Sequence, residues 1–85
     1  MRVRTNEVVW QELDDGIVVL NLTTSRYLRI NASASVLWRR LEHGANFDEL
    51  VAALLESFEI DETTARRDVE TFVTAAKELE LIVGE

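Results

Sequence analysis

Residues 17–31, IVVLNLTTSRYLRIN, decide the fold of this chain. They contain two short apolar segments, 17–22 and 26–30, which are separated by the polar residues TTS. β-Branched and aromatic side chains dominate both segments, and such side chains fit the pleated, half-buried surface of a sheet. We therefore predict two strands that are joined by a short polar turn.

Side chains alternate along the second of these strands, so Tyr27 and Arg29 are expected to face one way and Leu28 and Ile30 the other. Asn31 follows directly, and because asparagine caps helices, the strand should end where a helix begins. In a simple meander this strand has a neighbour on one side only. Its other edge would offer unpaired N–H and C=O groups to an extended peptide, and we predict that this edge is the functional surface.

A further strand is predicted over residues 7–13, ahead of this pair. Asp14-Asp15-Gly16 follows it, and Asp-Gly between two apolar runs is typical of a hairpin with a type I′ turn, in which glycine supplies the positive φ. The run IVVL at 17–20 is apolar at every position, which predicts a central strand that is buried on both faces. Together these segments predict a three-stranded antiparallel sheet.

From Asn31 onward the apolar spacing changes from two to about 3.6 residues, which indicates helices. We predict three helices, over residues 32–42, 47–58 and 62–80, and then a short extended segment at 81–83. Asn46 and Asp61 are the expected caps of the second and third helices. A small sheet followed by three helices is an α+β fold, and the last two helices resemble the helix-turn-helix of a winged helix. No linker or repeat divides the 85 residues, so a single domain over 1–85 is expected.

The composition argues against several classes of partner. The chain has 16 acidic and 9 basic residues and a net charge of −7, which disfavours nucleic acid and anionic membranes. It has no cysteine, so disulfide and thiol chemistry are absent. No apolar signal segment follows Met1, and the longest apolar run, LVAALL, is far shorter than the roughly 18 residues of a membrane span. We expect a soluble, cytoplasmic protein that binds neither nucleic acid nor membrane.

No group of residues has the pattern of a catalytic or cofactor site. The one histidine, His43, precedes Gly44 at the expected end of a helix, where the helix dipole favours a partly positive imidazole. A zinc site would need a second His or Cys ligand, and the isolated glycines form no phosphate-binding loop. We therefore predict a protein that is not an enzyme and that needs no cofactor and no metal.

In order and spacing, these motifs resemble the PqqD-like family, whose small domains recognise leader peptides in pathways for ribosomally made, post-translationally modified peptides. Within that family the chain is most similar to the stand-alone recognition proteins of lasso-peptide clusters. The family often has glycine where Glu80 stands here. The motifs that carry the resemblance are Ile17-Val18-Val19-Leu20, Tyr27-Leu28-Arg29-Ile30-Asn31, Leu37-Trp38, Phe47-Asp48-Glu49-Leu50, Asp68-Val69, Phe72-Val73 and Leu81-Ile82.

The resemblance implies a protein that binds the leader of a precursor peptide as an added strand and delivers it to a separate leader peptidase. The leader would lie beside the strand at 26–30 and against the third helix. Val73 is placed at the border of that helix's apolar stripe, so Val73→Asp is expected to weaken binding without unfolding the protein. Arg29 and Arg66 would attract an acidic leader. The candidate peptide-binding residues are Arg26, Tyr27, Leu28, Arg29, Ile30, Arg66, Val69, Phe72, Val73 and Ala76.

Other interpretations remain open. A winged-helix DNA-binding regulator is one, although the acidic residues of the third helix have the wrong sign for phosphate contacts. A PqqD-type chaperone of another peptide-modification pathway would carry the same motifs. The open strand edge can also pair with a second copy of the chain, which predicts a homodimer.

Overall fold

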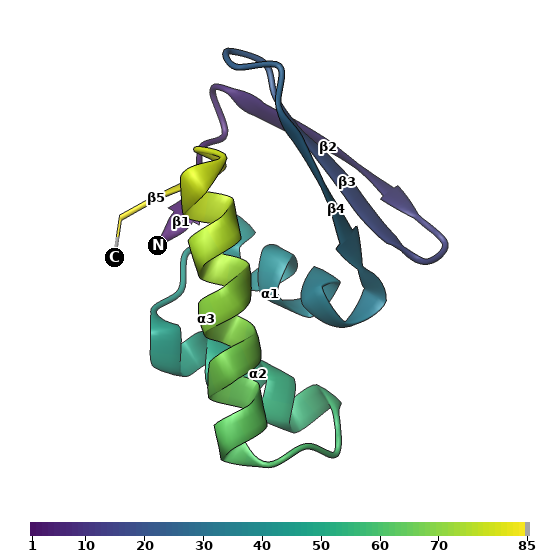
Figure 1. The fold of residues 1–85 in the computed structure, drawn as a ribbon, viewed down its shortest axis with the longest axis vertical. Helices are drawn as coiled ribbons and strands as arrows, with labels where there is room; N and C mark the ends of the chain where they lie inside the picture. The colour runs from purple at the N-terminus through teal and green to yellow at the C-terminus, as the bar shows by residue number, and fades with distance from the viewer. Residues whose placement is uncertain (85) are drawn as a thin grey trace.

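The computed structural model describes residues 1–84 and contains a three-stranded sheet on three helices, as Figure 1 shows. This arrangement confirms the predicted α+β fold, in which three antiparallel strands are followed by three helices. Within residues 1–84, no helix has both the length and the apolar character that crossing a membrane requires. The elements are β1 (Arg2–Val3), β2 (Val8–Leu13), β3 (Gly16–Asn21), β4 (Tyr27–Asn31), α1 (Ala32–His43), α2 (Phe47–Ser57), α3 (Glu62–Glu78) and β5 (Ile82–Val83).

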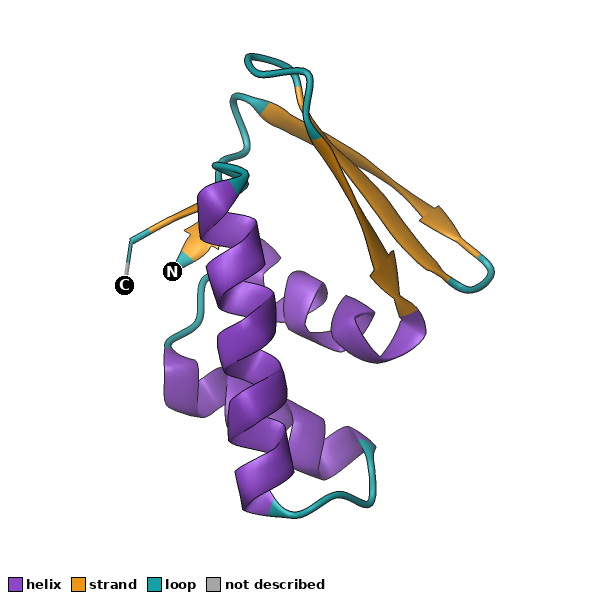
Figure 2. Ribbon diagram, viewed as in Figure 1, coloured by secondary structure: helices purple, strands orange, loops and turns teal. Residues whose placement is uncertain are grey.

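The main sheet is an antiparallel meander in the order β2-β3-β4, and the helices lie on one side of it (Figure 2). Along β3, Ile17 and Val19 are buried, whereas Val18 and Leu20 are only half-buried. The prediction that β3 is buried on both faces is therefore wrong. Although the run at 17–20 is apolar at every position, only one of its faces is covered, because the helices pack against a single side of the sheet.

The β2–β3 hairpin closes through Asp14 and Asp15, since Leu13 pairs with Gly16. Neither aspartate has a positive φ, so the turn is not the type I′ turn that the sequence predicted. Gly16 is needed for a different reason: a Cβ atom at this position would overlap the carbonyl oxygen of Ile30 on β4. The glycine thus allows β3 and β4 to approach each other.

A second, two-stranded sheet joins β1 to β5, so segments from the two ends of the chain lie side by side. The sequence predicted the extended segment at β5 but missed β1. Val3 and Ile82, which face each other across this pair, are both buried. The N–H of Arg4 donates to the carbonyl of Leu81 over 3.0 Å and continues the pairing.

Each helix begins at the cap that the sequence predicted. The side chains of Asn31, Asn46 and Asp61 each accept a hydrogen bond, 2.8 Å long, from the backbone N–H three residues further on. Helix α3 ends at Glu78, two residues earlier than expected, because Glu80 adopts a left-handed conformation with φ of 57°.

Candidate functional site

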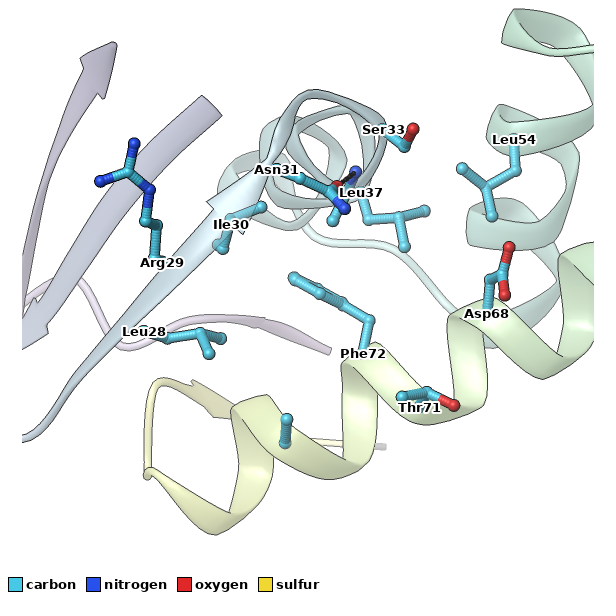
Figure 3. A pocket seen from close by; sticks show the side chains of 12 residues that line it. Leu28, Arg29, Ile30, Asn31, Ser33, Leu37, Leu54, Asp68, Thr71 and Phe72 are labelled. Carbon is cyan, nitrogen blue, oxygen red and sulfur yellow. Dashed lines mark hydrogen bonds between the residues drawn. The ribbon is translucent and has the colours of Figure 1, made fainter. Parts of the chain in front are cut away.

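A groove of about 410 Å³ lies between β4 and α3, and Figure 3 shows it from close by. Its volume falls within the range of about 300–1,000 Å³ that is usual for ligand sites. Four elements contribute to its walls, and most of the lining is apolar. The lining residues are Leu28, Arg29, Ile30, Asn31, Ser33, Ala34, Leu37, Leu54, Asp68, Thr71, Phe72 and Ala75.

The open strand edge that the sequence predicted is present. Within residues 1–84, β4 pairs with β3 and with no other strand, so its second edge keeps unpaired peptide groups. This edge borders the groove, because Leu28, Arg29 and Ile30 of β4 belong to the groove lining. Asn31, which ends β4 and caps α1, belongs to the lining as well. A segment of extended chain placed in the groove would therefore meet both backbone donors and acceptors and an apolar wall.

The predicted alternation along β4 is confirmed. Ile30 is buried and Leu28 is half-buried, whereas Tyr27 is 67% exposed and Arg29 is exposed on the opposite face. In Figure 3 the side chain of Arg29 points away from Phe72. Arg29 instead reaches the β2–β3 turn, where its Nη2 atom lies 3.1 Å from a carboxylate oxygen of Asp15.

The side of α3 that faces the groove is not the side on which the sequence placed Val73. Val73, predicted to lie at that border, is only 8% exposed, and Val69 and Ala76 are fully buried in the core. An aspartate at position 73 would therefore bury a charge, and the expectation that the fold survives Val73→Asp is not supported. The groove is lined by the opposite border of the apolar stripe, with Asp68, Thr71, Phe72 and Ala75.

Arg66 does not line the groove and joins α3 to α2. Its Nε atom lies 2.9 Å from a carboxylate oxygen of Glu62, and its Nη2 atom lies 3.4 Å from Asp48. Its guanidinium carbon also lies 6.0 Å from the centre of the Phe47 ring. The pKa of Arg66 is raised, mainly because its side chain donates a hydrogen bond to Glu62. All these charges are exposed, so the contacts contribute little to stability.

Four of the ten candidate residues therefore line the groove, namely Leu28, Arg29, Ile30 and Phe72. Six do not. Arg26 lies in the connection before β4, and Tyr27 is on the far face of the sheet. The other four are on α3, outside the groove lining: Arg66, Val69, Val73 and Ala76.

The sequence interpretation missed Asn21, a polar side chain that is only 1% exposed. Its Nδ2 atom donates to the carbonyls of Glu80, over 2.8 Å, and Leu79, over 3.4 Å, at the end of α3. Its Oδ1 atom accepts hydrogen bonds from the N–H groups of Thr23 and Thr24 in the connection to β4. Asn21 thus joins the end of β3, and the turn that follows it, to the residues that end α3. The signal was a polar residue at an inward position of an otherwise apolar strand.

An α+β domain with an unpaired strand edge above an apolar groove has the features of a peptide-binding domain. Residues 16–82 match the model of a family that is described as Coenzyme PQQ synthesis protein D (PqqD). The chain therefore belongs to the PqqD family, and the family that the sequence motifs indicated is confirmed.

Two solved structures are similar over nearly the whole chain. One is of TbiB1 in complex with the TbiA(beta) leader peptide; its identity is 33%, its TM-score is 0.88, and the match covers 100% of this chain and 98% of that one. The other is of lasso peptide synthetase B1 complexed with the leader peptide. Its identity is 28%, its TM-score is 0.81, and the match covers 98% of this chain and 96% of that one. No curated protein matches the chain.

Proposed function

We propose that the chain is a non-catalytic protein that binds the leader of a ribosomally made precursor peptide and delivers it to a separate leader peptidase in lasso-peptide biosynthesis. The observation that carries this proposal is the unpaired edge of β4 beside a largely apolar groove. The two similar structures support it, because both of those proteins are in complex with a leader peptide.

In this proposal the leader adds a strand to β4. Its backbone would exchange hydrogen bonds with the open edge of β4, which gives affinity with little dependence on sequence. Every second leader side chain would point into the groove and meet the apolar surface of Leu28, Ile30, Leu37 and Phe72. Because this surface excludes water, the hydrogen bonds of the added strand become stronger than they are in open solvent.

The residues that line the groove are consistent with the proposed non-catalytic role. Its lining has no histidine, cysteine or lysine, and the only histidine of the chain, His43, ends α1. Within residues 1–84, no three His, Cys, Asp or Glu side chains form a group that would hold a metal ion. Removal of the leader is therefore assigned to a separate peptidase that acts on the precursor while this chain holds it. A cytoplasmic location remains a prediction.

Peptides that carry single N-methyl groups test strand addition directly. We would measure the affinity of a precursor leader peptide by fluorescence anisotropy and then methylate its backbone nitrogens one at a time. Methylation removes a hydrogen-bond donor without changing a side chain. A peptide that is methylated at a nitrogen facing β4 should therefore bind about fivefold more weakly. Methylation of the nitrogens between these should change the affinity little. A loss of affinity that does not alternate from one residue to the next would contradict strand addition.

A further inference from the structure

The charges in the groove support a more specific statement about the peptide, and this statement rests on the proposed function. Only Arg29 and Asp68 carry a charge among the residues that line the groove. Arg29 is bridged to Asp15, and its side chain points away from Phe72 (Figure 3). The carboxylate of Asp68 is therefore the charge that a bound peptide would meet.

Asp68 has no ion pair within residues 1–84. Side chains three and four residues apart are neighbours on a helix surface, and on α3 these positions hold no basic residue. They are occupied by Thr64, Ala65, Thr71 and Phe72. The lining that α1 and α2 contribute is uncharged as well. No basic side chain in the described groove is paired with this carboxylate.

The neighbours of Asp68 make this charge selective. A peptide in the groove would cover the exposed carboxylate of Asp68, which lies beside the buried apolar side chains of Leu54 and Phe72. Covering a carboxylate without a partner removes its hydration at a cost, whereas a cation at the same place restores the lost interaction. The groove therefore favours a basic side chain beside Asp68 and rejects an acidic one.

We propose that the groove selects a peptide strand with an apolar side chain beside Phe72 and a lysine or arginine, two residues away, beside Asp68. The two residues are one turn apart, about 6 Å along α3. Alternate side chains of a strand are about 6.7 Å apart and lie on one face, so residues i and i+2 match this spacing where the peptide runs along α3. The selected charge is opposite to the one that Arg29 and Arg66 suggested, because neither guanidinium faces into the groove.

Selection from random-sequence peptides by mRNA display tests this proposal, with the wild-type chain, Asp68→Lys and Glu70→Lys as baits. Glu70→Lys is the matched control, because it makes the same charge change at an exposed position of α3 outside the groove lining. The wild type and the control should enrich an apolar and a basic residue spaced by two. Asp68→Lys should enrich an acidic residue in place of the basic one.

Synthetic copies of an enriched peptide give the size of the preference. Replacing its basic residue with glutamine should weaken binding to the wild type by about twofold to fivefold, as is usual for a partly exposed ion pair, and less at high salt. The same replacement should have no effect on binding to Asp68→Asn.

The possible failures are distinguishable. If the wild type enriches acidic and basic residues equally, or if the basic preference survives Asp68→Lys, the charge assignment is overturned while strand addition stands. If none of the three baits enriches peptides above the empty matrix, peptide binding by the groove is itself contradicted.

Discussion

At the scale of single residues, Asn21 is a buried polar side chain that joins β3 to the end of α3. Its side chain makes hydrogen bonds to the end of α3 and to the connection before β4. We expect Asn21→Ala to lower the free energy of unfolding by about 2–3 kcal/mol, because buried backbone groups lose their partners. Urea denaturation measures this change.

The control for this variant is Asn6→Ala, which alters an exposed asparagine. It should change the free energy of unfolding by less than about 0.5 kcal/mol. Peptide affinity should also fall in Asn21→Ala, since the sheet that carries β4 is no longer joined to the end of α3 through this side chain. An Asn21→Ala protein as stable as the control would show that these hydrogen bonds contribute nothing net.

Glu80 occupies a backbone conformation that suits glycine. Its φ of 57° lets the N–H of Leu81 donate to the carbonyl of Ala76 over 2.9 Å, which closes the end of α3. We expect Glu80→Gly to stabilise the protein by about 0.5–1 kcal/mol, as relief of the left-handed strain exceeds the entropy cost of glycine.

Glu78→Gly provides the matched comparison, because Glu78 is the last residue of α3 and is also exposed. Here glycine should destabilise by up to about 1 kcal/mol. Thermal melts of the two variants should therefore shift in opposite directions. A shift in the same direction would contradict the role assigned to the conformation of Glu80.

At the scale of elements, the start of α3 depends on a carboxylate. The backbone N–H of Thr64 donates to Asp61, and this hydrogen bond lowers the pKa of Asp61. Because the folded state lowers this pKa, the stabilisation is present above the ordinary carboxyl pKa of about 3.9. It is lost as the pH falls through the lower, folded value.

The variant Asp61→Asn keeps a capping oxygen that does not titrate. We expect its stability to fall less than that of the wild type when urea unfolding is followed from neutral to acidic pH. Parallel pH profiles for the two proteins would show that Asp61 does not contribute to acid sensitivity.

Most elements were predictable because their signals are local. β-Branched and aromatic side chains indicated the strands of the main sheet, and the caps Asn31, Asn46 and Asp61 marked the helix starts. Strand β1 was missed because it has two residues and pairs with the distant β5, so no local period reveals it.

The groove was only partly predictable for a related reason. The inward residues Leu28 and Ile30 follow from the strand period alone. The side of α3 that faces β4 depends on how α1 and α2 pack beneath it, which no periodicity within α3 specifies. The apolar stripe is wide enough to include both Val73 and Phe72, and only the packing decides which of them meets the groove.

At the scale of the whole molecule, one edge is available to two kinds of partner. A second copy of the chain and a leader peptide would both pair with β4, so they should compete. We expect any dimer seen by light scattering at high protein concentration to dissociate when leader is added. An N-methylated leader that cannot pair with β4 should leave the dimer intact. A dimer that persists with saturating leader must form through another surface.

The pairing of β1 with β5 has a consequence for protein engineering. It places Met1 and Gly84 beside each other, on the side of α3 that faces away from the main sheet (Figure 1). A short bridge between these two residues would permit circular permutation, and a domain fused beside them would leave the groove unobstructed. The architecture is thus suited to use as a portable module within larger polypeptides.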